Sequence, residues 1–85
     1  MQTMYIFELG RLVGVQDVTN WPVEMIDRTL AGLVMCRRTG EVSDKGRGIC
    51  CVCQKDLGER ELPSGRLSHG LCDRAECKEA KHETS

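Results

Sequence analysis

Apolar residues recur at three- and four-residue steps in one part of the chain. Val23, Ile26, Leu30 and Leu33 follow this spacing, which places their side chains on one face of an α-helix. Charged residues occupy several of the intervening positions, as on the solvent-facing side of a helix. The pattern predicts an amphipathic helix over about residues 21–38.

The residues that flank this segment agree with a helix. Asn20 can act as the N-cap, and Pro22 is tolerated in the first turn because its missing N–H has no partner there. Arg37 and Arg38 lie near the end of the segment, where cations interact favourably with the helix dipole. Gly40 is expected to provide the C-cap.

The N-terminal segment has a different pattern. Gly10 and Gly14 would each weaken a helix by about 1 kcal/mol relative to alanine. Val13, Val15 and Val18 favour extended structure. We therefore expect a strand or an irregular hairpin over residues 4–18. The stretch 41–48, EVSDKGRG, is rich in Gly, Ser and Asp, which predicts a linker.

These elements divide the chain in two. Residues 1–44 are expected to contain the N-terminal strand or irregular segment and the amphipathic helix, and residues 45–85 a second, cysteine-rich module. At 85 residues, the chain lies in a size range where apolar burial alone gives only marginal stability. An additional constraint is therefore expected.

Cysteine supplies a candidate for that constraint. Cys50 and Cys53 form one close pair, Cys72 and Cys77 form a second, and the connector between the pairs is rich in turn-forming and charged residues. Two thiolate pairs that converge can provide the four vertices of a tetrahedral Zn²⁺ site. The spacing predicts one structural zinc ion held by these four residues.

Two alternatives to this ligand set remain open. Cys51 could replace Cys50, and His69 could replace Cys77 because it precedes Cys72 by three residues. On one continuous helix, Cys72 and Cys77 would lie about 140° apart around the axis. Cys72 is therefore expected before a helix that runs from about Arg74 to Lys81, with Cys77 in its first turn.

Asp73 and Glu76 have the spacing of a capping box, which marks the expected start of this last helix.

The sequence also indicates the cellular setting. The first residues lack the basic and apolar regions of a secretory signal, so we expect a cytoplasmic, reducing location, where metal binding is favoured over disulfides. The longest apolar or small run, 30–36, is far below the roughly 20 residues that span a bilayer.

The cysteine segment resembles the cysteine-rich tail of some bacterial sensory and signalling proteins, and of small uncharacterised bacterial and phage proteins. In that tail a CxxC-K segment is followed by a loop and then by SHGxCxxC. The matching positions are Cys50, Cys53, Lys55, Ser68, His69, Gly70 and Cys72. The resemblance implies a small α+β fold with a treble-clef-like or zinc-ribbon-like site, a short hairpin and a terminal helix. This chain departs from the pattern in its shorter connector and in the four residues between Cys72 and Cys77, and no activity follows from the resemblance.

Function is less strongly indicated than metal binding. Four cysteines would close the coordination of zinc, and the phosphate-binding and serine-nucleophile motifs are absent, so we do not expect an enzyme. We expect a small protein-interaction adaptor or regulator. The alternative is a nucleic-acid-binding regulator, although a formal net charge of −1 gives no general affinity for phosphate. A local basic patch would then be required, and the candidates are Arg37, Arg38, Lys45 and Arg47, joined by Lys55, Arg66 and Arg74.

Zinc is expected to be coupled to folding. A closed structural site rarely exists in an unfolded chain, so the free energy of metal binding stabilises the fold. We expect metal removal to unfold residues 48–82 and to leave the helix at 21–38 partly formed.

Overall fold

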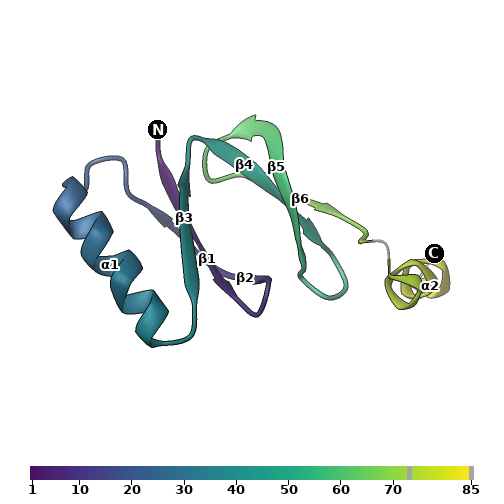
Figure 1. Ribbon diagram of the computed structural model, residues 1–85. Coiled ribbons are helices and arrows are strands. Elements are labelled where there is room, and N and C mark those ends of the chain that lie inside the picture. Colours follow the sequence, from purple (N-terminus) through teal and green to yellow (C-terminus); the bar gives the residue numbers. More distant parts are fainter. Residues whose placement is uncertain (73, 85) are drawn as a thin grey trace.

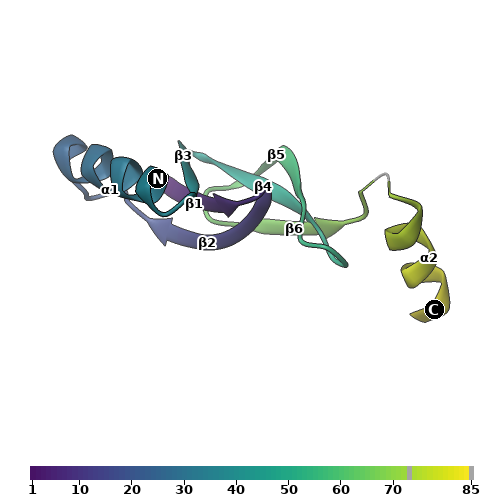
Figure 2. The same ribbon diagram turned by 60° about the horizontal axis from the view of Figure 1, so that its bottom comes forward.

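The computed structural model describes residues 1–72 and 74–84 and shows a small α+β fold (Figure 1). Two three-stranded sheets lie between two helices, and Figure 2 shows the helices again at opposite ends of the molecule. The elements in chain order are β1 (Thr3–Glu8), β2 (Arg11–Asp17), α1 (Val23–Met35), β3 (Thr39–Ser43), β4 (Lys45–Cys50), β5 (Asp56–Pro63), β6 (Leu67–Gly70) and α2 (Ala75–Thr84).

The first sheet has the strand order β2-β1-β3 and is antiparallel throughout. The hairpin predicted over residues 4–18 is confirmed. Strands β1 and β2 are joined by Leu9 and Gly10, whose φ angles are 53° and 79°. Two residues with positive φ form the kind of turn whose twist matches a hairpin, and Gly10 adopts this conformation without steric cost.

Helix α1 packs on β3, and the predicted amphipathic helix is confirmed with shorter ends. The N-cap is Pro22, without a side-chain hydrogen bond, so the prediction for Asn20 is wrong. At the other end Arg37 has a φ of 59°, and the N–H of Arg38 donates to the carbonyl of Leu33 at 2.8 Å. This Schellman-type ending stops the helix before Gly40. Neither helix is long and apolar enough to cross a membrane, within the residues that the structure describes.

Gly40 has a packing role in place of the predicted C-cap. It belongs to β3, and a Cβ atom at this position would lie 2.5 Å from a methyl of Leu30 and 2.8 Å from a methyl of Leu33. The absence of a side chain therefore lets the apolar stripe of α1 approach the strand. Strand β3 covers only part of that stripe, because no residue of α1 is buried.

The predicted linker at 41–48 is wrong, because these residues form the end of β3 and most of β4, with only Asp44 between the strands. The glycines that suggested flexibility are required by close packing. A Cβ atom on Gly46 would lie 2.5 Å from Cβ of Leu62 and 2.8 Å from the carbonyl oxygen of Arg66. The second of these atoms is backbone and cannot rotate away.

Gly46→Ala is accordingly expected to destabilise the protein by about 2 kcal/mol, within the range for overpacked sites. Gly32→Ala provides a control of opposite sign, because Gly32 lies in α1 and a Cβ there would have no atom within 4 Å. That change should stabilise the protein by about 0.5–1 kcal/mol through helix propensity. Chemical denaturation of both variants measures the two effects. Equal stability of the Gly46 variant and the natural protein would contradict the packing argument.

The second sheet has the strand order β5-β4-β6. Strand β4 lies in the centre, antiparallel to β5 and parallel to β6. The parallel register pairs Ile49 with His69 and Cys50 with Gly70. It therefore brings the segment that precedes α2 beside the end of β4, where the first cysteine pair begins.

One apolar core joins the two sheets. Tyr5, Phe7 and Leu12 of the first sheet pack with Ile49 of the second. The Tyr5 hydroxyl, in a fully buried residue, donates to the carbonyl of Lys45 at 2.7 Å and accepts from the N–H of Gly65 at 3.1 Å. Asp44 separates the last strand of the first sheet from the first strand of the second, and the division of the chain into residues 1–44 and 45–85 stays a prediction. Independent folding of either part stays a prediction.

The prediction that Arg47 belongs to a surface basic patch is wrong. Its side chain is buried between the sheets, paired with Glu41 and with Asp56 at 3.4 Å. The guanidinium carbon also lies 5.8 Å from the ring centroid of Tyr5 and 5.5 Å from that of Phe7. Arg47 is therefore a core residue. Two other members of the patch have acidic partners, since Arg38 lies 3.5 Å from Glu8 and Lys45 lies 3.6 Å from Glu61.

Candidate metal centre

The four predicted cysteines converge at the end of the second sheet that faces α2. The sulfur atoms of Cys50, Cys53, Cys72 and Cys77 all lie within 4.8 Å of one another, and the Cys53 and Cys72 sulfurs are 3.6 Å apart. Zinc–sulfur bonds of about 2.3 Å in a tetrahedron place sulfurs about 3.8 Å apart. The cluster is therefore close to the dimensions that one such ion requires.

The first pair lies on a tight turn. Cys50 is the last residue of β4, and its carbonyl accepts a hydrogen bond from the N–H of Gln54 at 2.9 Å. The N–H of Cys50 donates to the carbonyl of Lys55, also at 2.9 Å, where the chain returns toward β5. Gln54 has a φ of 61°, so the chain reverses sharply after Cys53. Because of this turn, both sulfurs face the same point.

The second pair is divided between a loop and a helix, as predicted. Cys72 precedes α2, and Cys77 lies in its first turn, where the N–H of Cys77 donates to the carbonyl of Arg74 at 3.1 Å. Arg74 and Glu76 form an ion pair at 3.1 Å on the exposed side of this turn. The capping role predicted for Asp73 lies outside the described residues.

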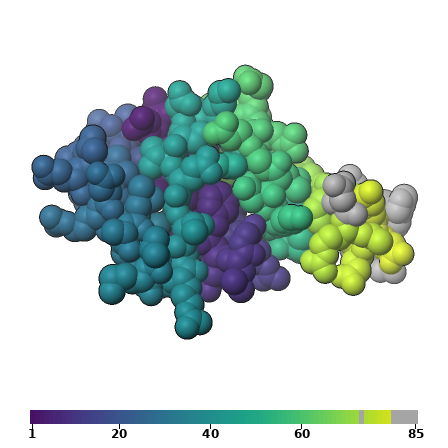
Figure 3. Space-filling view, viewed as in Figure 1, coloured from purple at the N-terminus to yellow at the C-terminus, as the bar shows by residue number. Residues whose placement is uncertain are grey.

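Most of the cluster is shielded from water. Cys50, Cys72 and Cys77 are buried and Cys53 is partly exposed, while Leu57 and Leu71 pack against the group. Helix α2 lies at one end of the molecule (Figure 3), and the sulfur cluster is the main feature that attaches its described residues to the rest of the fold. At this end of the molecule, the buried cysteine side chains therefore take the place of an apolar core.

The thiols influence one another strongly. The backbone N–H of Cys53 donates to the sulfur of Cys50 and is the main reason that the pKa of Cys50 is lowered to about 5. A hydrogen bond with the side chain of Cys72, followed by burial, raises the pKa of Cys77 to about 12. The thiolate of Cys50 is thus favoured, and ionisation of Cys77 is opposed by its neighbours. A bound divalent cation would remove this opposition, because a coordinating thiol is deprotonated outright.

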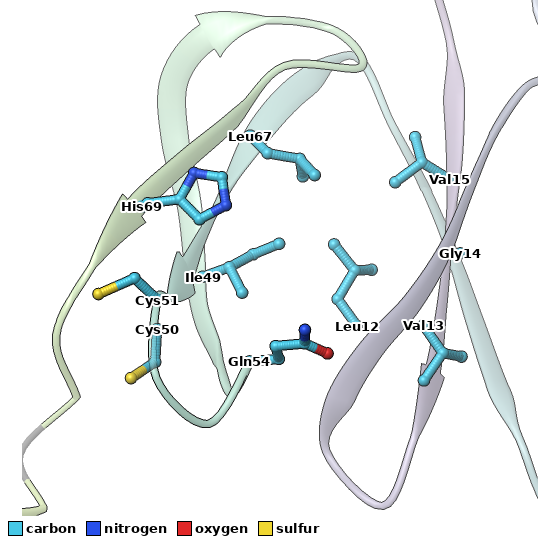
Figure 4. Close-up of a pocket in the computed structure, with 10 residues that line it drawn as sticks. All are labelled: Leu12, Val13, Gly14, Val15, Ile49, Cys50, Cys51, Gln54, Leu67 and His69. Atoms are coloured by element: carbon cyan, nitrogen blue, oxygen red, sulfur yellow. The ribbon is translucent and has the colours of Figure 1, made fainter. Parts of the chain in front are cut away.

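The two alternative ligands lie outside the cluster. Cys51 is exposed, and its N–H donates to the carbonyl of Gly70 at 2.9 Å. His69 lies on β6 and lines a cleft between the sheets, away from the sulfur atoms (Figure 4). No two of the six cysteines form a disulfide.

Three cations surround the most exposed member of the cluster. Arg11, Lys55 and Arg74 line a hollow of about 160 Å³ together with Cys53. Four thiolates and one divalent cation carry a net charge of −2, so nearby positive charge stabilises such a centre. Arg11 comes from the first sheet and was not predicted near the site. The fold brings it there through the pairing of Arg11 with Lys55.

Comparisons with known proteins give no relative from which a role can be inferred. No family model matches the chain, and neither curated proteins nor solved structures include a match.

Proposed function

We propose that Cys50, Cys53, Cys72 and Cys77 bind one structural Zn²⁺, in a treble-clef-like module made of the β4–β5 turn and the start of α2. The observation that carries the proposal is the convergence of four sulfurs, three of them buried, at the only extensive attachment of α2 among the described residues. With four sulfur ligands the ion has no open position for a substrate. The site is therefore proposed to be structural and the protein not to be an enzyme.

We further propose that the protein is a small interaction adaptor or regulator in the cytoplasm. Large apolar side chains remain on the surface of α1, including Val23, Val34 and Met35, which are 73%, 69% and 88% exposed. An exposed apolar group of this kind is typical of protein contact sites when it is contiguous. A reducing compartment would keep the thiols available for metal.

Native mass spectrometry of the purified, untreated protein tests the metal proposal. We expect a mass excess of one zinc ion per chain, because the sulfur cluster offers one tetrahedral site. The Cys51→Ser variant should retain the same excess, since Cys51 lies outside the cluster. A mass excess of one iron ion with visible absorbance would show that the site binds iron and not zinc. A metal-free, folded chain with reduced thiols would contradict the proposal.

Nucleic-acid binding remains the second candidate, favoured by the gathering of Arg11, Lys55 and Arg74 around one hollow. The basic patch that the sequence predicts around residues 37–47 gives less support, because Arg47 is buried and Arg38 and Lys45 have acidic partners. Binding of DNA or RNA that weakens steeply with salt would favour this role. An absence of binding at low ionic strength would remove it.

A further inference from the structure

A cleft of about 280 Å³ lies between the two sheets, on the side opposite the sulfur atoms of the metal site (Figure 4). Leu12 and Val15 of β2 form one wall, and Ile49 of β4 and Leu67 of β6 form the other. The sulfur atoms of Cys50 and Cys51 point away from the cavity. The cleft is therefore distinct from the sulfur cluster, although Cys50 of β4 contributes to both.

The cleft exists because the two sheets diverge. At one end the N–H of Leu12 donates to the carbonyl of Gln54 at 3.3 Å, which holds β2 against the turn of the first cysteine pair. Val15 lies farther along β2 and pairs with Tyr5, so it belongs to the face that carries the core. It is nevertheless 42% exposed. The core is therefore incompletely covered at this point.

Two outer strands border the opening. Strand β2 is at the edge of the first sheet and β6 at the edge of the second, within the described chain. The N–H of Val18 donates to the carbonyl of Gln2 at 3.1 Å, and bonded and non-bonded pairs alternate along an antiparallel ladder. The register of β1 with β2 therefore turns the backbone groups of Val15 and Asp17 away from β1. The N–H and carbonyl of Val15 can pair with an added strand, whereas the carbonyl of Asp17 accepts from the side-chain amide of Gln16 at 3.2 Å.

The chemistry of the lining selects an uncharged occupant. None of the ten residues that line the cleft is Asp, Glu, Lys or Arg. Gln54 and His69 are the polar side chains on otherwise apolar walls. The volume lies just below the range of about 300–1,000 Å³ for small-molecule pockets. It suits one large apolar side chain better than a complete cofactor.

We propose that this cleft binds an extended segment of a partner protein, which adds a strand to the free edge of β2 and inserts one large apolar side chain between Leu12, Ile49 and Leu67. Main-chain hydrogen bonds would supply affinity, and the pocket would select the side chain, as in other cases of strand addition. This inference rests on the proposed interaction function and specifies its surface and the chemistry of its partner.

The test uses random peptides displayed on phage, selected against the zinc-loaded protein. We expect enriched peptides with one large apolar residue flanked by strand-forming residues. Val15→Lys should weaken binding of the enriched peptides by about tenfold or more, because a cation would enter a cleft with mainly apolar walls and no carboxylate. Leu67→Lys changes the opposite wall and should have the same effect. Leu9→Lys, in the turn between β1 and β2, is the control: Leu9 is 94% exposed and does not line the cleft, so binding should be unchanged.

Metal content and circular dichroism of each variant show whether it folds, and the partial exposure of Val15 and Leu67, 42% and 37%, favours tolerance of the change. Enriched peptides that bind the two cleft variants normally would overturn the cleft assignment while leaving an interaction function in place. An absence of enriched peptides would overturn both. A dimer in solution that Val15→Lys dissociates would identify a second copy as the occupant and would also overturn this proposal.

Discussion

Replacement of Cys50 by serine is expected to abolish zinc retention and to unfold most of the chain. Cys50 is fully buried at the centre of the proposed site, and three sulfurs bind zinc far less well than four. Structural zinc contributes about 10–16 kcal/mol of apparent binding free energy, which is comparable to the whole stability of a small domain, about 5–15 kcal/mol. Loss of the ion should therefore leave too little stability for the folded state. Thermal denaturation followed by circular dichroism measures this loss.

Cys51→Ser is the matched control for this experiment. The two cysteines are adjacent in sequence, but Cys51 is exposed and lies outside the sulfur cluster, so its replacement should change neither zinc content nor melting temperature appreciably. Treatment of the natural protein with a strong chelator should reproduce the Cys50→Ser result, which separates metal loss from the effect of a serine in a buried position. Retention of zinc by Cys50→Ser together with its loss in Cys51→Ser would show that the ligand set is wrong.

The structure extends the expected range of unfolding beyond the cysteine module. The sequence predicts that metal loss unfolds residues 48–82 and leaves the helix at 21–38 partly formed. However, β4 both ends in Cys50 and contributes Ile49 to the core shared with Tyr5 and Phe7. Disorder of β4 should therefore expose the inner face of the first sheet. We expect α1 to keep only partial helicity, because it has no buried residue of its own.

Local signals explain what the sequence could predict. The apolar stripe of α1, the N-terminal hairpin and the separation of Cys72 from Cys77 depend on residues that are close in the chain. The convergence of the two cysteine pairs followed from the coordination preference of zinc. In each case one short segment, or the demand of one ion, contained enough information.

Long-range packing explains what the sequence could not predict. The glycines of segment 41–48 resemble those of a linker, yet Gly46 is required by the approach of Leu62 and Arg66. Arg47 resembled a surface cation for the same reason, since the residues that bury it come from β1, β3 and β5. The flanking glycines Gly46 and Gly48 were the available signal, because they occur where a neighbouring chain approaches closely. The cleft was missed because it arises between sheets, from residues that are distant in sequence.

Arg47→Met is expected to destabilise the protein by about 3 kcal/mol. The guanidinium is the cation between Glu41 and Asp56 and lies near the rings of Tyr5 and Phe7. Removal of one partner from a buried ion pair typically costs about 3–5 kcal/mol, because the remaining charge is left uncompensated. The lower end of this range applies because Glu41 is half-exposed and can regain water. Urea denaturation of the zinc-loaded variant provides the measurement.

Arg38→Met makes the same chemical change at the surface and serves as the control. Arg38 and Glu8 are each nearly half-exposed, at 45% and 46%, and a solvated pair of this kind contributes at most about 1 kcal/mol. Adding Glu41→Gln to Arg47→Met should restore part of the lost stability, because the carboxylate that lost its partner is then neutral. If Arg47→Met were as stable as the natural protein, the packing of the methionine against Tyr5 and Phe7 would be sufficient to join the sheets. If it were destabilised without rescue by Glu41→Gln, the contribution of Arg47 would come from its contacts with the rings and with Asp56.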